Sequence, residues 1–269
     1  MDSKVVLITG GSSGIGKSIG QYLKKKGFIV YGTTRKLNQK SKSTSFELLE
    51  MDVTDVRTIQ NTISSILEKE GRLDVLINNA GIGITGPIEE TPHEEILQAF
   101  DTNFNGPLHM VKAVLPQMRK QQSGLIINIT SIAGYMGLPY RGIYSATKGA
   151  VSLITEVLRM EVKDFGIHIT NLAPGDFVTN IASGRYHAPI LDDSPYKTPY
   201  KNTLELINEG VNDGEDPILV AQTVLKIINT KNPKVHYKVG SFMQKFSLFL
   251  KKALPDKVYE KLLLNHYKL

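Results

Sequence analysis

The sequence predicts a single α/β domain built on a doubly wound parallel sheet. Three observations lead to this fold class: short apolar runs alternate with longer helical patterns, a glycine-rich turn follows the first run, and neither a repeat nor a linker divides residues 1–269. The repeated order of strand, helix and strand predicts right-handed crossovers between parallel strands.

The predicted strands cover residues 4–9, 28–33, 46–51, 73–78, 125–130, 167–172 and 235–239. Their centres are continuous apolar stretches, as expected for strands that helices cover on both faces. Helical patterns fill the intervals, for example at residues 17–26, 92–100, 106–120 and 144–165.

The helix predicted from residue 92 begins with Thr91-Pro92-His93-Glu94. This segment is typical of a capping box with proline at the first helical position, so we expect His93 to start a helix rather than bind a ligand. Metal-ligand spacing is absent from the sequence, and we therefore expect no metal site.

Two segments depart from the alternating pattern. Residues 180–217 are polar and rich in Pro, Asp, Tyr and Lys, which predicts an irregular substrate-binding insertion or, alternatively, a surface excursion. Residues 241–269 predict a tail of two short amphipathic helices, with apolar side chains recurring at helical spacing. These apolar residues are Phe242, Phe246, Phe249, Leu250 and Leu254, followed by Val258, Leu262 and Leu263.

Composition and charge exclude several classes of function. The chain has no cysteine, which rules out disulfides, thiolate metal sites and cysteine nucleophiles. The net charge is +6, and eight lysines against Asp256 and Glu260 give the segment from residue 234 onward the same value. The body is therefore near neutral, which argues against a nucleic-acid-binding face.

Targeting segments are not evident in the sequence. The run Val5–Ile8 is too short for the apolar part of a signal peptide, and no apolar run approaches the roughly 20 residues that span a bilayer. We therefore expect a cytoplasmic protein without a transmembrane segment.

The run Thr9-Gly10-Gly11-Ser12-Ser13-Gly14-Ile15-Gly16 follows the first strand and opens the first helix. Glycines let the backbone approach a pyrophosphate, whose charge then lies at the N–H groups of the helix N-terminus, as in Rossmann-type domains. The run from Gly11 to Ser18 also matches a P-loop, which makes a nucleoside triphosphatase the rival reading. A P-loop protein also needs an aspartate at the end of a strongly apolar strand. Asp52 is the nearest candidate, but its strand contains Glu47 and Glu50, which argues against this alternative.

Further motifs follow in a fixed order along the chain. They are Asn78-Asn79-Ala80-Gly81, Asn103 within Asp-Thr-Asn-Phe-Asn-Gly, Ser131 after the fifth strand, Tyr144-Ser-Ala-Thr-Lys148, and Pro174-Gly175. Together with the glycine-rich turn, this set resembles the short-chain dehydrogenase/reductase family over about residues 4–240. The segment from Gly134 to Tyr144 resembles its 17β-hydroxysteroid and retinol dehydrogenase branch, which implies a lipophilic substrate.

The catalytic candidates suit carbonyl reduction and the reverse reaction. Hydride transfer to a carbonyl leaves an alkoxide, which the hydroxyl of Tyr144 can protonate if its pKa falls from about 10. Lys148 lies one helical turn later and favours the phenolate, while Ser131 can hold the substrate oxygen. The resemblance implies the same roles, and adds that Lys148 binds the nicotinamide ribose and that Asn103 anchors a water in a proton relay.

Two other readings of these residues are weaker. Tyr144 and Lys148 alone would be an ordinary exposed helix pair, but Ser131 at the end of a central strand argues for a site. Ser145 and Lys148 match the S-x-x-K motif of penicillin-recognising hydrolases, which also requires a K-T-G strand. The nearest match, Lys197-Thr198-Pro199, carries a proline that would interrupt a strand.

The end of the second strand favours NADP(H) over NAD(H). NAD-dependent enzymes place an acidic residue there, where this chain has Thr34. Arg35 can bind a 2′-phosphate through two hydrogen bonds, and Lys36 adds positive charge. Ser13 stands where a basic residue marks other NADP-dependent relatives.

By the resemblance, the cofactor-binding residues are Gly10, Ser12, Ser13, Gly14, Ile15, Gly16, Arg35, Asp52, Val53, Asn79, Ala80, Gly81, Tyr144, Lys148, Pro174, Gly175, Phe177 and Thr179. The catalytic residues are Asn103, Ser131, Tyr144 and Lys148. The resemblance also implies a homo-oligomer, either a dimer or a tetramer.

The sequence therefore predicts an NADP(H)-dependent oxidoreductase that interconverts an alcohol and a carbonyl on a small-molecule substrate. The alternative from another class is a catalytically idle dinucleotide sensor on the same fold. For the basic tail three roles remain open: covering the mouth of the active site, contacting another subunit, or lying on an anionic membrane surface.

Overall fold

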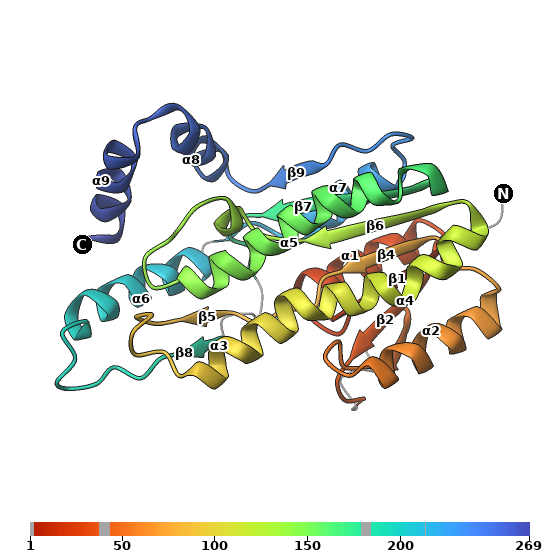
Figure 1. Cartoon of the computed structure of the whole chain (residues 1–269), viewed down its shortest axis with the longest axis horizontal. Helices are drawn as coiled ribbons and strands as arrows, with labels where there is room; N and C mark the ends of the chain where they lie inside the picture. Colours follow the sequence, from red (N-terminus) through yellow and green to blue (C-terminus); the bar gives the residue numbers. More distant parts are fainter. Residues whose placement is uncertain (1–2, 38–43, 179–183, 213) are drawn as a thin grey trace.

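The computed structural model describes residues 3–37, 44–178, 184–212 and 214–269. Its centre is a 7-stranded parallel sheet of order β3-β2-β1-β4-β6-β7-β9 (Figure 1). The strands are β1 (Val5–Ile8), β2 (Ile29–Thr34), β3 (Glu47–Glu50), β4 (Val75–Asn78), β6 (Gly124–Ile129), β7 (Ile167–Pro174) and β9 (His236–Val239). The doubly wound sheet expected from the sequence is confirmed, with strand ends shifted by one or two residues in most cases.

Helices cover both faces of the sheet. The helices of the main body are α1 (Gly14–Lys25), α2 (Val56–Glu70), α3 (His93–Phe100), α4 (Gly106–Gln121), α5 (Gly142–Glu161) and α7 (Ile218–Ile228). Alternate residues of β1 belong to different cores: Val5 and Leu7 pack with α2 and α4, whereas Val6 and Ile8 pack with α1 and α7. Two buried faces explain why the strands read as continuous apolar runs.

The expected capping box at α3 is wrong. The helix begins at His93 with Pro92 as its N-cap residue, and no side chain caps it. The N-cap residue Pro92 has no side-chain oxygen that could accept from the helix N–H groups. The Thr91 hydroxyl instead donates to the Pro87 carbonyl oxygen at 2.6 Å, within the preceding turn. The helix predicted over residues 144–165 is shorter at its C-terminal end than expected. Helix α5 ends at Glu161, and a short 3₁₀ turn, Lys163–Phe165, follows it.

The insertion is less irregular than expected. Its described part contains β8 (Tyr186–His187), which pairs with β5 (Ile84–Thr85), and the 16-residue helix α6 (Lys197–Asn212). Pro199 is tolerated because it lies in the first turn of α6, and the K-T-G-like segment is thus helical. The missed signal was the helical spacing of Tyr200, Thr203 and Ile207, all of which are buried.

The tail forms the two helices that the sequence predicts, α8 (Phe242–Ala253) and α9 (Asp256–Tyr267). They lie at the opposite end of the molecule from the N-terminus (Figure 1). Leu248 and Tyr259 form a separate apolar cluster with Ile132 and Met136, two residues of the segment that follows β6. Among the described residues, no helix is long and apolar enough to cross a membrane.

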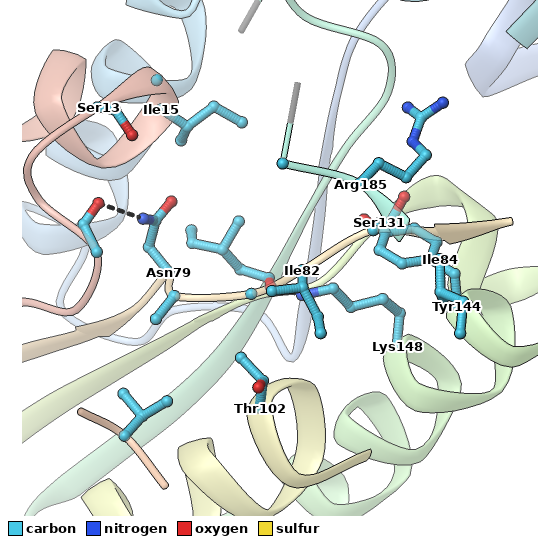
Figure 2. Close-up of a pocket in the computed structure, with 18 of the residues that line it drawn as sticks. Ser13, Ile15, Asn79, Ile82, Ile84, Thr102, Ser131, Tyr144, Lys148 and Arg185 are labelled. Atoms are coloured by element: carbon cyan, nitrogen blue, oxygen red, sulfur yellow. Dashed lines mark hydrogen bonds between the residues drawn. The ribbon is translucent and has the colours of Figure 1, made fainter. Parts of the chain in front are cut away.

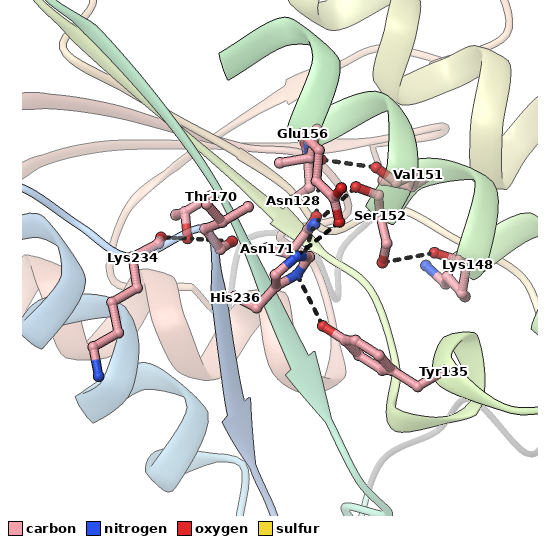
Figure 3. A network of polar contacts seen from close by, with 12 residues as sticks. Asn128, Tyr135, Lys148, Val151, Ser152, Glu156, Thr170, Asn171, Lys234 and His236 are labelled. Atoms are coloured by element: carbon pink, nitrogen blue, oxygen red, sulfur yellow. Dashed lines mark hydrogen bonds and ion pairs between the residues drawn. The ribbon is translucent and has the colours of Figure 1, made fainter. Parts of the chain in front are cut away.

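A buried polar network ties the sheet to α5 (Figure 3). The Asn78 side-chain amide donates to Asn128 Oδ1 at 2.9 Å, and Asn128 Nδ2 donates to Thr155 Oγ1 at 2.8 Å. The Thr155 hydroxyl lies 2.9 Å from Asn171 Oδ1, which extends the network to β7. Strands β4, β6 and β7 are thereby fixed relative to the helix that carries the catalytic candidates.

The network continues to the last strand and to the loop after β6. His236 Nδ1 lies 3.0 Å from the Tyr135 hydroxyl, and its Nε2 lies 2.9 Å from a carboxylate oxygen of Glu156 (Figure 3). Burial raises the pKa of Tyr135 to about 12, and the Glu156 charge acts in the same direction. Tyr135 therefore stays a neutral hydrogen-bonding group that anchors its loop to β9.

We expect Asn128→Ala to lower the free energy of unfolding by about 1–3 kcal/mol, because it removes the buried acceptor of the Asn78 amide and the buried donor to Thr155 Oγ1. Urea unfolding followed by circular dichroism measures this change. Asn202→Ala is the matched control: Asn202 is exposed on α6, and its loss should change stability by less than about 0.5 kcal/mol. An Asn128→Ala protein as stable as the control would show that the network contributes nothing.

Candidate active site

A cleft of about 1250 Å³ opens at the carboxyl ends of the parallel strands. The loops that follow β1, β2, β3, β4, β6 and β7 all contribute to its lining. Figure 2 shows Ser13, Ile15 and Asn79 at one end and Ser131, Tyr144 and Arg185 at the other. The predicted residues that line the cleft are Gly10, Ser12, Ser13, Gly14, Ile15, Arg35, Asp52, Val53, Asn79, Ala80, Gly81, Ser131, Tyr144, Lys148, Pro174, Gly175 and Phe177.

Two predicted residues are placed differently. Gly16 does not line the cleft; a Cβ atom on it would clash with the Gly10 carbonyl oxygen and lie 2.5 Å from Asn79 Nδ2. Its missing side chain allows the turn to fold against the loop after β4. Asn103 lies behind the cleft and is fully buried. Thr179 lies outside the described residues.

The glycine-rich turn is locked to the loop after β4. The Thr9 hydroxyl oxygen accepts hydrogen bonds from the backbone N–H groups of Asn79 and Ala80, both at 2.9 Å. In return, Asn79 Nδ2 donates to the carbonyl oxygens of Thr9, at 2.9 Å, and Gly10, at 3.1 Å. Gly10 has φ +66°, a conformation that favours glycine. These bonds hold the turn open at the N-terminus of α1, where a phosphate can bind.

The region after β2 and β3 forms an electropositive rim. Arg35 and Lys36 are exposed, and Arg35 makes no hydrogen bond or ion pair within the described parts of the chain. The Asp52 carboxylate accepts from the backbone N–H of Thr54 at 2.9 Å and from its hydroxyl at 2.8 Å. The Glu50 carboxylate, which accepts from the Leu37 N–H at 3.2 Å, also lies beside this rim. Both carboxylates thus bind groups other than Arg35, which leaves the arginine available for an anion.

Ser131, Tyr144 and Lys148 come together at the other end of the cleft. Ser131 lies two residues after the end of β6 and caps the 3₁₀ turn η3 (Ile132–Tyr135), with its Oγ accepting from the Ala133 N–H at 3.1 Å. Lys148 Nζ donates to the Ile129 carbonyl oxygen at 3.1 Å and lies 5.9 Å from the ring centroid of Tyr144. Lys148 is only 6% exposed, so its charge acts in a weakly screened environment.

The approach of η3 to α5 depends on Gly134. A Cβ atom at this position would lie 2.9 Å from the Lys148 carbonyl carbon and 3.1 Å from the Gly149 nitrogen. Both contacts are with backbone, which cannot move aside as a flexible side chain can. Glycine at this position thus allows the loop that carries Ser131 to lie against the helix that carries Tyr144 and Lys148.

Asn103 contacts two segments of the cleft wall without lining the cleft itself. It lies in a π-helical turn, η2 (Asp101–Asn105), between α3 and α4. Its Nδ2 donates to the Ile82 carbonyl oxygen at 2.9 Å and to Thr147 Oγ1 at 3.2 Å, while its Oδ1 accepts from the Ile82 N–H at 2.8 Å. Both amide protons are committed, so the side chain joins the loop after β4 to α5 and has no donor left for a water.

Sequence reasoning missed Arg185, a residue of the insertion that lines the cleft. Its Nη1 atom is buried without a hydrogen-bond partner in the described structure. Burial lowers the pKa of the guanidinium, and the charge of Arg141 acts in the same direction. Gly83 leaves the space that this side chain fills, since a Cβ there would lie 2.8 Å from Arg185 Cγ. Because no motif surrounds Arg185, the sequence carried no signal for it.

The tail supports the cleft without lining it. No described residue from 241 to 269 belongs to the lining. Gln244 Nε2 nevertheless donates to Asp176 Oδ2 at 2.7 Å, and Asp176 does line the cleft. Leu248 packs in the cluster that contains Ile132, next to Ser131. The tail therefore contacts two segments next to the cleft, at Asp176 and at Ile132, without lining it.

Comparison with known proteins agrees with this geometry. The family model for short chain dehydrogenase matches residues 4–189. A 3-ketodihydrosphingosine reductase of Bacteroides thetaiotaomicron is 40% identical over 97% of this chain and 96% of its own length. Mouse 17-beta-hydroxysteroid dehydrogenase type 1 is 31% identical over 88% of this chain and 74% of its own length.

Solved structures show the same relationship. A short-chain dehydrogenase from Streptomyces avermitilis superposes with a TM-score of 0.83 at 31% identity, covering 99% of this chain and 97% of its own. ElxO with NADP bound gives a TM-score of 0.72 at 31% identity, with 89% and 97% coverage. The P-loop hypothesis is wrong, and neither Lys17 nor Ser18 lines the cleft. The chain belongs to the short-chain dehydrogenase family, and it is an oxidoreductase that acts on CH–OH groups with NAD(P).

Proposed function

We propose that this protein is an NADPH-dependent reductase of a ketone on a long-chain lipid, with Tyr144 as the general acid. The observation that carries the proposal is the convergence of Ser131, Tyr144 and Lys148 at the end of the cleft remote from the glycine-rich turn. The relative from Bacteroides thetaiotaomicron supports a lipid ketone, because its name specifies a 3-keto sphingoid base. 3-Ketodihydrosphingosine is therefore the first substrate to test.

The side chains suit a reduction in which NADPH supplies the hydride. Ser131 Oγ accepts from the Ala133 N–H, so its hydroxyl proton is available for the substrate carbonyl oxygen. As the carbonyl carbon gains a hydride, its oxygen becomes an alkoxide and takes the proton of Tyr144. The Lys148 ammonium, beside the Tyr144 ring, stabilises the phenolate that remains.

Lys148 also suits the nicotinamide ribose. An ammonium group has three donors, and within the described residues one of them is filled, by the Ile129 carbonyl oxygen. A ribose hydroxyl in the cleft would accept from a second donor. This second contact supports a role for Lys148 in cofactor binding as well as in proton transfer.

The rim after β2 supports NADP(H). Thr34, which stands where an acidic residue would repel a phosphate, uses its hydroxyl to donate to the Lys36 carbonyl oxygen at 3.3 Å. Arg35 is exposed beside the cleft without a partner in the described chain, so a 2′-phosphate can be its counterion. The related ElxO structure contains NADP.

Arg185 supports a substrate with an oxygen acceptor near its ketone. A buried guanidinium nitrogen without a hydrogen bond is unfavourable, and an oxygen atom of a bound substrate would satisfy it. Arg185 lines the cleft together with Tyr144 and Asp176, which supports contact with a substrate held near Tyr144. We propose that Arg185 orients the polar end of the lipid.

We expect Tyr144→Phe to lower kcat for ketone reduction by about 10²–10⁴-fold, because the proton donor is lost, with little change in NADPH affinity. Lys148→Ala should weaken both turnover and NADPH binding. NADPH oxidation and fluorescence titration measure the two quantities. Tyr140→Phe is the matched control, since Tyr140 lies outside the cleft lining. Tyr144→Phe activity within tenfold of the unmodified protein would contradict the mechanism.

Arg35→Asp should shift the preference from NADPH toward NADH by roughly ten- to hundredfold, because a charge-assisted contact of about 1.5–3 kcal/mol is replaced by repulsion. The ratio of kcat/KM for the two cofactors measures the shift. Arg57→Asp makes the same change of charge at a side chain outside the cleft lining and should leave the ratio unchanged. If the NADPH/NADH ratio of kcat/KM were the same in Arg35→Asp and Arg57→Asp, Arg35 would not contact the cofactor.

Arg185→Met should raise KM for 3-ketodihydrosphingosine about tenfold and leave NADPH affinity intact, because it removes the donors while keeping an apolar side chain of similar length. Steady-state kinetics at saturating NADPH give the measurement. Arg185→Lys restores the charge but not the planar donor pair, so its KM should fall between the two. An unchanged KM in Arg185→Met would exclude contact with the substrate.

A further inference from the structure

Helix α8 exposes a row of aromatic side chains. Phe242, Phe246 and Phe249 follow one another at single-turn spacing and are 74%, 38% and 62% exposed. Their rings stack in sequence, with centroids 5.8 Å and 6.0 Å apart. Met243 adds a further exposed apolar side chain, at 69%. An exposed apolar patch of this kind marks a surface that meets a partner or a membrane.

Lysines border this row on one side. Lys245 lies three residues after Phe242 and four before Phe249, and Lys252 lies three residues after Phe249. Both lysines are exposed, and α8 contains no acidic residue. The helix thus carries an apolar stripe along a cationic edge, which is the pattern of helices that lie in a membrane interface.

A shallow groove beside α8 gathers more positive charge. It has a volume of about 550 Å³, and its lining includes Lys226, Lys238 and Lys245, with Phe242 and Glu215. No lysine of the groove has an ion-pair partner in the described residues. Burial lowers the pKa of Lys238, and the nearby charge of Lys252 adds to the effect. Like charges held this close favour an anionic ligand such as a phosphate group.

The orientation of α8 is fixed by its opposite face. Leu248 is 4% exposed and packs against the loop after β6. Ser241 and Gln244 form a capping box, and Gln244 also bonds to Asp176. Because these contacts hold one side of the helix against the body, the phenylalanine row cannot turn inward without breaking them.

We propose that α8 docks this protein on an anionic lipid bilayer, with the Phe242–Phe249 row in the interface and the bordering lysines on lipid phosphates. A bilayer fits better than a protein partner, because lysine is depleted from protein interfaces whereas aromatic and lysine side chains together favour anionic membranes. The charge distribution agrees, since residues from 234 onward carry a net charge equal to the +6 of the whole chain. The inference is independent of which ketone the enzyme reduces.

Flotation of the full-length protein with large unilamellar vesicles tests this proposal. We expect binding to vesicles of 70% phosphatidylcholine and 30% phosphatidylglycerol, and weaker binding as salt rises. Phe242→Ser with Phe249→Ser should lower binding at least tenfold. Lys245→Gln with Lys252→Gln should lower it by about fivefold for each lysine.

Two matched controls separate docking from general effects. Lys24→Gln with Lys25→Gln removes the same charge from an exposed part of α1, and Val56→Ser removes an exposed apolar side chain from α2. Both should bind vesicles as the unmodified protein does. Thermal melting and NADPH titration show whether each variant is folded.

Three outcomes would overturn the proposal. The unmodified protein fails to float with anionic vesicles, the control variants lose binding as much as the α8 variants do, or the phenylalanine variant lowers the molar mass in solution without changing vesicle binding. The last result would assign the row to contact between copies of the chain.

Discussion

The close contact between the loop after β6 and helix α5 is the constraint on which the site depends. Gly134 lies against the backbone of Lys148 and Gly149, where a Cβ atom would not fit. This contact brings Ser131 beside Tyr144, although the two residues come from different elements. The same short segment also anchors Tyr135 to His236 and packs Ile132 and Met136 under the tail. One loop therefore joins the end of the cleft that holds Ser131 and Tyr144 to the last strand and to α8 and α9.

The sequence was most informative where one physical requirement governs a whole segment. Strands buried on both faces need continuous apolar residues, and this pattern is clearest in β1 and β4, which are buried along their whole length. The edge strands β3 and β9 were also predicted, although they contain charged or polar residues and are only partly buried. The glycine-rich turn and the Tyr144–Lys148 pair were readable because their chemistry fixes both residue type and spacing. Membership of the family followed from the order of these motifs, and the comparisons confirm it.

Features that depend on contacts between distant segments could not be read in this way. The hydroxyl of Thr91 binds a carbonyl in the preceding turn instead of capping α3. The side-chain amide of Asn103 forms its hydrogen bonds with Ile82 and Thr147, which are remote in the sequence. Arg185 is a site candidate only because its side chain fills the space beside Gly83 and lines the cleft. In each case the residue type allows several partners, and the tertiary structure selects one.

The π-helical turn Asp101–Asn105 fixes how many residues must separate α3 from α4. The Gly106 N–H bonds to the carbonyl oxygen of Asp101, five residues back, so this turn contains one residue more than an ordinary α-helical turn. Each residue of an α-helix advances the direction of its side chain by about 100°. A shorter connection, with a regular helix running through α3 and α4, would swing the Asn103 amide away from Ile82. The number of residues between α3 and α4 therefore matters for the position of Asn103. A relative without the extra residue of the π-helical turn would need another side chain to bond α5.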